Sequence, residues 1–96
     1  MKKYPNFPNV PVEEDTRILH QKEIEIENIP VLIQKWAWEG IVAESVIFHN
    51  KEVVKFSDEE LFQKIADNYD VGPDKRYTVK RNDDGYAFVN FNFITF

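Results

Sequence analysis

The sequence predicts an α+β domain: a mostly antiparallel meander sheet of five or six strands, with one helix at about residues 58–69 packed on one face and a C-terminal β-hairpin. Two observations predict this fold. Apolar and polar side chains alternate with period two from residue 18 onward, which is typical of strands. One segment instead shows the 3.6-residue period of an amphipathic helix. A chain of 96 residues is long enough for a single core, so we expect one domain.

The first 17 residues predict an extended arm ahead of a single domain at residues 18–96. Pro5, Pro8 and Pro11 recur every three residues, and proline removes backbone donors and favours extended conformations. We interpret the segment as an arm that lies along its own domain. A ligand for a proline-binding domain of the SH3 type is the alternative.

Residues 18–27 predict the first strand of the sheet. Ile24 and Ile26 point to one face, and the alternating glutamates Glu23, Glu25 and Glu27 point to the other. This strand therefore has an acidic face toward solvent. Pro30 is expected to break the pairing before the next strand.

Residues 31–38 and 41–48 predict a hairpin, because both are rich in strand-forming residues and Glu39-Gly40 suits a two-residue turn. Closing the turn there fixes the register. The predicted cross-strand pairs are Lys35 with Glu44, Ile33 with Val46, and Leu32 with Ile47. The register matches opposite charges and pairs apolar side chains on both faces.

A short strand at residues 52–56 is expected next, followed by the helix. Ser57 and Glu60 have the spacing of a capping box, and acidic residues in the first turn suit the positive end of the helix dipole. The predicted apolar stripe of the helix is Leu61, Phe62, Ile65, Ala66 and Tyr69.

Residues 76–82 and 86–94 predict the C-terminal hairpin. A three-residue loop at 83–85, with Gly85 in the left-handed conformation, separates apolar from polar side chains best. The expected pairs are Val79 with Val89, Tyr77 with Phe91, and Lys80 with Phe88. Ala87, Val89 and Phe91 then face the core, while Tyr86 and Phe88 lie on the opposite face.

Both faces of the 31–48 hairpin are apolar, which predicts a contact surface. A helix is about 10 Å wide and strands lie about 4.8 Å apart, so one helix covers two or three strands on one face. The arm, a curled sheet or another protein chain has to cover the rest. Tryptophan is enriched at binding hot spots. The predicted partner-binding residues, for a protein partner or a homodimer, are Trp36, Trp38, Ile41 and Ile47.

Residues 84–91, DGYAFVNF, resemble the first ribonucleoprotein motif of the RNA-recognition fold at seven of its eight positions. The resemblance implies exposed aromatic side chains that stack bases. The predicted nucleic-acid face is Arg76, Lys80, Tyr86 and Phe88. Asp84 replaces the leading basic residue, and five residues after Phe91 leave no room for the family's second helix and fourth strand. An aromatic hairpin strand also explains the pattern, so nucleic-acid binding remains the alternative.

The net charge of the chain disfavours nucleic-acid binding unless basic residues are grouped locally. A net charge of −5 repels polyanions, so a nucleic-acid binder needs a local basic patch. The acidic residues themselves suggest a further alternative, an inhibitor that imitates nucleic acid. The side chains concerned are Glu23, Glu25, Glu27, Asp58, Glu59, Glu60, Asp67, Asp70 and Asp74.

Sequence motifs for catalysis, metals and cofactors are absent. The chain has no cysteine, and neither His20 nor His49 is spaced from carboxylates as in a recognised metal or base motif. We therefore predict a non-enzymatic protein with no metal, cofactor or small-molecule substrate. The sequence shows no signal peptide or membrane-spanning run, so a cytoplasmic location is expected.

Overall fold

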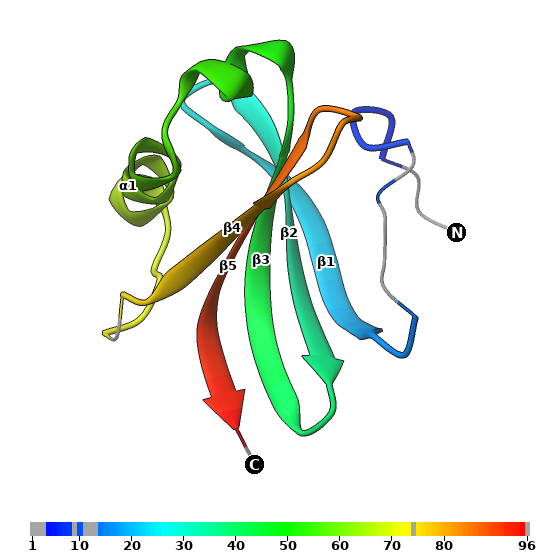
Figure 1. Cartoon of the computed structure of the whole chain (residues 1–96). Coiled ribbons are helices and arrows are strands. Elements are labelled where there is room, and N and C mark those ends of the chain that lie inside the picture. The colour runs from blue at the N-terminus through cyan, green and yellow to red at the C-terminus, as the bar shows by residue number, and fades with distance from the viewer. Residues whose placement is uncertain (1–3, 9, 11–13, 74, 96) are drawn as a thin grey trace.

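The computed structural model describes residues 4–8, 10, 14–73 and 75–95, and it confirms the α+β fold (Figure 1). Within this range the chain forms one five-stranded antiparallel sheet, one α-helix and one 3₁₀ turn. The elements are β1 (Arg17–Ile26), β2 (Ile29–Trp38), β3 (Ile41–His49), the 3₁₀ segment η1 (Lys51–Lys55), α1 (Asp58–Asn68), β4 (Tyr77–Arg81) and β5 (Tyr86–Thr95).

The strands lie in the order β1-β2-β3-β5-β4, and every neighbouring pair is antiparallel. The chain passes from β3 through α1 to β4, which is an edge strand of the sheet. β5 then returns and lies between β3 and β4 (Figure 1). The predicted registers of the β2–β3 and β4–β5 hairpins are confirmed. Glu39 and Gly40 have φ angles of 43° and 78°, as a two-residue turn of type I′ requires.

Residues 52–56 do not form the predicted strand. Residues 52–55 lie in the 3₁₀ segment η1, and Phe56 follows it. The Val53 amide donates to the Asn50 carbonyl at 3.0 Å and the Phe56 amide to the Val53 carbonyl at 3.1 Å. β3 already has β2 on one side and β5 on the other, so a returning strand has no edge of β3 to pair with. A tight turn buries Val53 and leaves Val54 70% exposed.

Pro30 does not break the second strand as predicted, because β2 begins at Ile29. Pro30 lies opposite Glu25 of β1. On the other side, the last pair between β2 and β3 joins Val31 to Phe48, so Pro30 lies beyond the paired part of these two strands. The missing N–H therefore removes no hydrogen bond to β3.

One core lies between α1 and the sheet. The predicted capping box starts the helix: Glu60 N donates to Ser57 Oγ and Ser57 N to Glu60 Oε1, each at 3.1 Å. The predicted helix stripe packs on the sheet, and Phe62 stacks on Tyr77 with ring centroids 4.1 Å apart. The buried residues of this core are Ile26, Val31, Ile33, Val46, Phe48, Val53, Leu61, Phe62, Ile65, Val71, Ala87, Val89 and Phe91.

A second, smaller core lies on the opposite face, under the N-terminal arm (Figure 1). Its buried residues are Phe7, Leu32, Ile47 and Tyr86, with Tyr4, Val10 and Phe88 packed around them. His49 joins the arm to the β4–β5 loop, because its Nδ1 lies 3.0 Å from the Asn6 carbonyl and its Nε2 3.1 Å from the Asp84 carbonyl. The arm thus covers one part of the second face.

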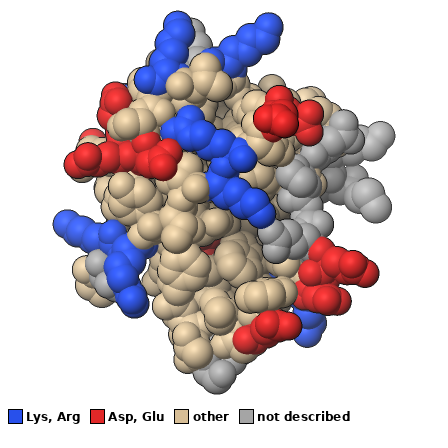
Figure 2. Space-filling view, in the orientation of Figure 1, with Lys and Arg blue, Asp and Glu red and all other residues tan. Residues whose placement is uncertain are grey.

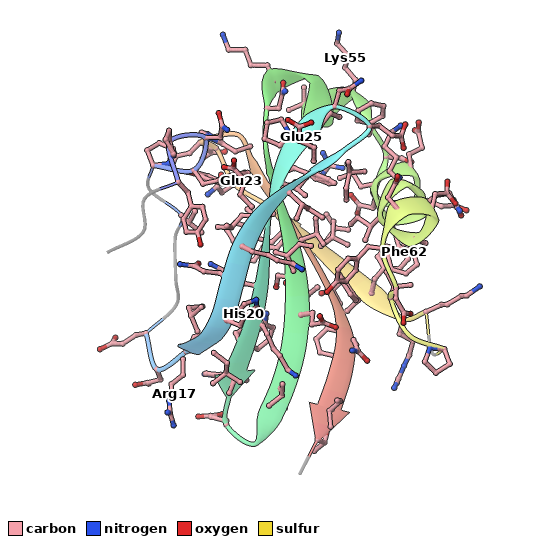
Figure 3. The ribbon with its side chains drawn as sticks, turned by 180° about the vertical axis from the view of Figure 1, so that it is seen from behind. Arg17, His20, Glu23, Glu25, Lys55 and Phe62 are labelled. Atoms are coloured by element: carbon pink, nitrogen blue, oxygen red, sulfur yellow. The ribbon has the colours of Figure 1, made fainter. Side chains whose placement is uncertain are left out.

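The outer strand β1 is largely polar. Figure 3 shows Arg17, His20, Glu23 and Glu25 following one another along it, on the side away from the view of Figure 1. In the part of the chain that the structure describes, no helix is long and apolar enough to cross a membrane.

Candidate functional site: a groove on the tryptophan-bearing face

A groove of about 400 Å³ opens on the second face of the sheet, beside the part that the arm covers. Four apolar side chains form much of its wall: Ile18, Trp36, Trp38 and Phe88. Its other lining residues are Thr16, Gln34, Ser45, Lys80, Arg81, Asn82 and Asn90. Figure 2 shows Lys and Arg side chains near the middle of this view of the molecule and a broad uncharged surface below them. The volume is in the range of ordinary ligand sites.

Strand alternation and register bring the aromatic side chains together. Trp36 and Trp38 are two residues apart on β2 and therefore share a face. Phe88 on β5 reaches the same face because it pairs with Ile47 of β3, which pairs with Leu32 of β2. The groove is thus built on rigid strands of the sheet.

A polar row crosses all five strands at the floor of this face. Neighbouring residues of the row pair in register: Gln21 of β1, Gln34 of β2, Ser45 of β3, Asn90 of β5 and Thr78 of β4. Gln34 Nε2 donates to Gln21 Oε1 at 3.1 Å. Ser45 Oγ donates to Asn90 Oδ1 at 2.5 Å, and Asn90 Nδ2 donates to Thr78 Oγ1 at 3.4 Å. The row separates the arm-side core from the tryptophan side chains.

Trp36 is attached to this row. Its indole Nε1 donates to Ser45 Oγ at 2.6 Å, so the buried hydroxyl accepts one hydrogen bond and donates another. The hydrogen bond holds the Trp36 ring in one orientation against the groove. A side chain that is already ordered loses little entropy when a partner binds.

A second hollow, of about 600 Å³, lies on β4 and β5 where β5 extends beyond its neighbour. Its lining residues are Lys75, Arg76, Tyr77, Thr78, Phe93 and Thr95. Among the described residues, no acidic side chain lines either hollow, although the whole chain has a net charge of −5. The described lining of the two hollows is therefore more basic than the molecule as a whole.

The cations differ in their orientation. Arg81 directs its guanidinium to the helix side, where it donates to Asp58 Oδ1 at 2.9 Å and to the Val53 and Phe56 carbonyls. Lys80 lines the groove, and Lys75 and Arg76 line the second hollow. These three side chains give the face its basic character.

The four predicted partner-binding residues do not share one environment. Trp36 and Trp38 line the groove, and Trp38 is 38% exposed. Ile41 is half-buried beside Trp38, its pairing partner. Ile47 is 0% exposed in the core under the arm, so it is a core residue and is not accessible to a partner.

The predicted nucleic-acid face is also divided. Phe88 and Lys80 lie together in the groove, whereas Arg76 lines the second hollow. Tyr86 is on the predicted face but is only 3% exposed, because the arm covers it and its ring stacks on His49 with centroids 3.9 Å apart. Tyr86 therefore has no open ring face on which a base could stack, and only Phe88 of the two motif aromatics reaches the groove.

Sequence reasoning missed the polar row and Ile18. The signal for the row was present: the two confirmed registers place Gln34 opposite Ser45 and Asn90 opposite Thr78. These four polar residues in facing pairs on neighbouring strands indicate hydrogen-bonded contacts, because buried polar groups are almost always paired. Ile18 gave no local signal, since its place in the groove depends on a register shift in β1 between Ile18 and His20.

A separate polar cluster joins α1 to the sheet. Tyr69 donates its hydroxyl to Glu44 Oε1 at 2.9 Å, and Asn92 Nδ2 donates to Glu44 Oε2 at 2.7 Å. Burial, followed by the hydrogen bond and the charge of Glu44, raises the pKa of Tyr69 to about 12. This cluster lies away from the groove. Its hydrogen bonds attach the end of the helix segment to the sheet, which is a structural role.

Other described acidic side chains form ion pairs outside the Tyr69–Glu44 cluster. Among the described residues, Glu27 pairs with Lys64 at 3.1 Å and Asp58 with Arg81, and Asp74 lies outside the described residues. Within the described residues, no three His, Asp or Glu side chains are grouped to hold a metal ion. No protein-family model, curated protein or solved structure matches this chain.

Proposed function

We propose that this chain is a small, non-enzymatic, cytoplasmic binding protein that acts through protein contact, self-association included, at the tryptophan-bearing groove. The observation that supports the proposal is the open groove between Trp36, Trp38 and Phe88. Of the described arm residues, Tyr4, Phe7 and Val10 pack over the neighbouring apolar surface of the same face, and the groove opens beside them.

Burial of the exposed tryptophan surface in the groove would release enough free energy to support a protein–protein contact. A tryptophan presents up to about 250 Å² of surface, so burying the 38% of Trp38 that is exposed removes roughly 90 Å² from water. At about 25 cal/mol per Å² this contributes about 2 kcal/mol from one side chain. Trp36 needs little further ordering, because Ser45 already holds its indole. Two adjacent tryptophans with a basic rim have the composition of a binding hot spot.

Sedimentation analysis over a range of protein concentrations tests the proposal. Trp38→Ala removes the most exposed groove aromatic, and Val54→Ala is the matched control because Val54 is 70% exposed on η1. We expect a mass above the 11.4 kDa monomer that returns to the monomer value in Trp38→Ala and persists in Val54→Ala. A mass equally changed, or equally unchanged, by both substitutions argues against self-association at the groove.

Nucleic-acid binding is the second candidate, supported by Lys80 and Phe88 lining one groove. Stacking on one aromatic ring contributes about 1–3 kcal/mol per base. The test is titration with single-stranded RNA at low salt, where binding by this face is weakened by salt and by Phe88→Ala. Phe93→Ala is the control, since Phe93 lies on the same strand outside the groove.

A further inference from the structure

His49 lies between the arm and the β4–β5 loop, with a backbone carbonyl at each ring nitrogen (Figure 1). Nδ1 is 3.0 Å from the Asn6 carbonyl oxygen, and Nε2 is 3.1 Å from the Asp84 carbonyl oxygen. A carbonyl oxygen only accepts hydrogen bonds, so each contact needs an N–H on the ring. A neutral imidazole carries one N–H, whereas the imidazolium carries two. Both contacts are therefore hydrogen bonds only when His49 is protonated.

The ring of Tyr86 also favours the charged form of His49. The two rings stack with their planes 7° apart and their centroids 3.9 Å apart. A cation within about 6 Å of the centroid of an aromatic ring is attracted by the negative face of that ring. The stacking contact and the two hydrogen bonds thus stabilise the same protonation state.

The two carbonyl groups differ in how firmly they are held. Asn82 Oδ1 accepts hydrogen bonds from the Asp84 and Tyr86 amides, each at 3.0 Å, and these bonds fix the loop. Asn6 is an exposed residue of the arm, which takes no part in the strand pairing of the sheet. A neutral ring therefore keeps its one N–H at Nε2, toward the fixed loop. The Nδ1 lone pair then faces the Asn6 carbonyl oxygen, and this repulsion weakens the attachment of the arm.

Other charged groups around His49 act on the ring from several elements. The exposed carboxylates on the loop and on β1 favour the imidazolium, and the exposed ammonium group on η1 opposes it, but solvent screens all of them. Among these residue types, histidine is the one whose charge ordinarily changes between pH 5 and 8. The described titratable side chains on the elements around His49 are Tyr4, Glu23, Lys51, Asp83, Asp84 and Tyr86.

We propose that His49 is a pH-dependent switch for the arm: the protonated ring holds the arm on the sheet, and the neutral ring releases it. The contribution of His49 to arm attachment is therefore complete at acidic pH and is lost as the ring gives up its proton. This inference goes beyond the proposed function and does not depend on it. Leu32 and Ile47 lie under the arm on the same face as the groove, so release adds apolar surface beside Trp36.

Hydrogen exchange at the Phe7 amide measures how often the arm opens. This amide donates to the Tyr4 carbonyl at 2.8 Å, and the Phe7 side chain is 4% exposed. The protection factor compares the exchange rate with that of an unstructured peptide at the same pH, so it excludes the direct effect of pH on exchange. In the ¹⁵N-labelled full chain we expect a protection factor at pH 5 at least about tenfold above that at pH 8, equivalent to about 1.4 kcal/mol.

The ring nitrogens of His49 provide a second measurement on the unchanged chain. Their ¹⁵N chemical shifts distinguish the doubly protonated ring from each neutral tautomer. We expect the doubly protonated ring at the acidic end of the titration and the Nε2–H tautomer at the basic end. The pH midpoint of this change should coincide with the midpoint of the change in Phe7 protection.

Two matched variants test the residue. His49→Phe keeps an aromatic ring beside Tyr86 but has no N–H, and His20→Phe makes the same change at the chain's other histidine, which is exposed on β1. The pH dependence of Phe7 protection should disappear in His49→Phe and persist in His20→Phe. Urea unfolding shows whether both variants fold, and if His49→Phe does not, the agreement of the two midpoints in the unchanged chain decides.

Four results would overturn the inference. They are equal Phe7 protection at pH 5 and pH 8, a Phe7 midpoint that differs from the His49 midpoint, a pH dependence that survives in His49→Phe, and a neutral His49 ring that carries its proton on Nδ1. Association of the chain is measured separately. If Phe7 protection does not follow His49 while association still depends on Trp38, the inference falls and the proposed function stands.

Discussion

Removing the Phe7 side chain tests how firmly the arm holds the second face. Phe7 is 4% exposed and packs in the core with Leu32, Ile47 and Tyr86. A phenylalanine buries about 200 Å², which at about 25 cal/mol per Å² corresponds to about 5 kcal/mol. Measured losses for Phe→Ala in protein cores are about 3–5 kcal/mol. These values set the upper limit for the loss of free energy of unfolding in Phe7→Ala.

The arm precedes β1 and takes no part in the strand pairing of the sheet, which reduces the loss of free energy of unfolding. When Phe7 is lost the arm can detach, and each released residue recovers about 1–2 kcal/mol of backbone entropy. The contacts of His49 with the Asn6 carbonyl and of Tyr4 with the Gln21 carbonyl oppose release. We therefore expect Phe7→Ala to lower the free energy of unfolding by about 2–3 kcal/mol, below the full core value.

Urea unfolding and amide hydrogen exchange measure this effect. Phe93→Ala is the matched control, because Phe93 is the same residue type at an exposed position of β5, and it should cost less than about 1 kcal/mol. Exchange at Tyr86 and His49 should rise in Phe7→Ala alone. A loss below about 0.5 kcal/mol, or unchanged exchange at Tyr86, would refute the argument that the arm covers this surface.

Three further predictions concern the polar contacts. Ser45→Ala leaves Trp36 Nε1 and Asn90 Oδ1 without their partner, so the free energy of unfolding measured in urea should fall by about 1–3 kcal/mol. The Trp36 indole proton should also exchange faster with solvent. Unchanged exchange would contradict the hydrogen bond between Trp36 and Ser45. The raised pKa of Tyr69, about 12 against a usual 10.0, means that its neutral form stabilises the fold fully below pH 10 and that this contribution is lost as pH rises through 12. The absorbance of the phenolate measures this titration. Tyr69→Phe should remove this part of the pH dependence of stability. A Tyr69 titration near pH 10 would contradict the prediction. Arg81→Met keeps the aliphatic stem but loses the contacts with Asp58 and two carbonyls. The free energy of unfolding measured in urea should therefore fall by about 1–2 kcal/mol. An unchanged free energy of unfolding would show that these contacts do not stabilise the fold.

The hairpins could be predicted from the sequence because their information is local. Period two fixes which residues share a face, and the turn residues fix the register. The pair Lys35–Glu44 and the pair Val79–Val89 follow from these two rules, and both are present. The capping box at Ser57 is local in the same sense.

The groove could be predicted only in part, because its shape depends on contacts between distant segments. Trp36 and Trp38 were identified as a surface from their own strand. Nothing local indicated that the arm would bury Ile47 and Tyr86, since that depends on where Phe7 docks. The 3₁₀ turn at Lys51–Lys55 was missed for a similar reason: its residues favour a strand, but the sheet offers β3 no vacant edge.

The two indole N–H signals of Trp36 and Trp38 test the central claim most directly, because they are the chain's only tryptophans and both line the groove. The measurement is an ¹⁵N NMR series over rising protein concentration, with the mass determined in parallel. We predict that the Trp38 indole signal shifts as a complex forms. A complex that forms while both indole signals stay in place would contradict protein contact at the groove.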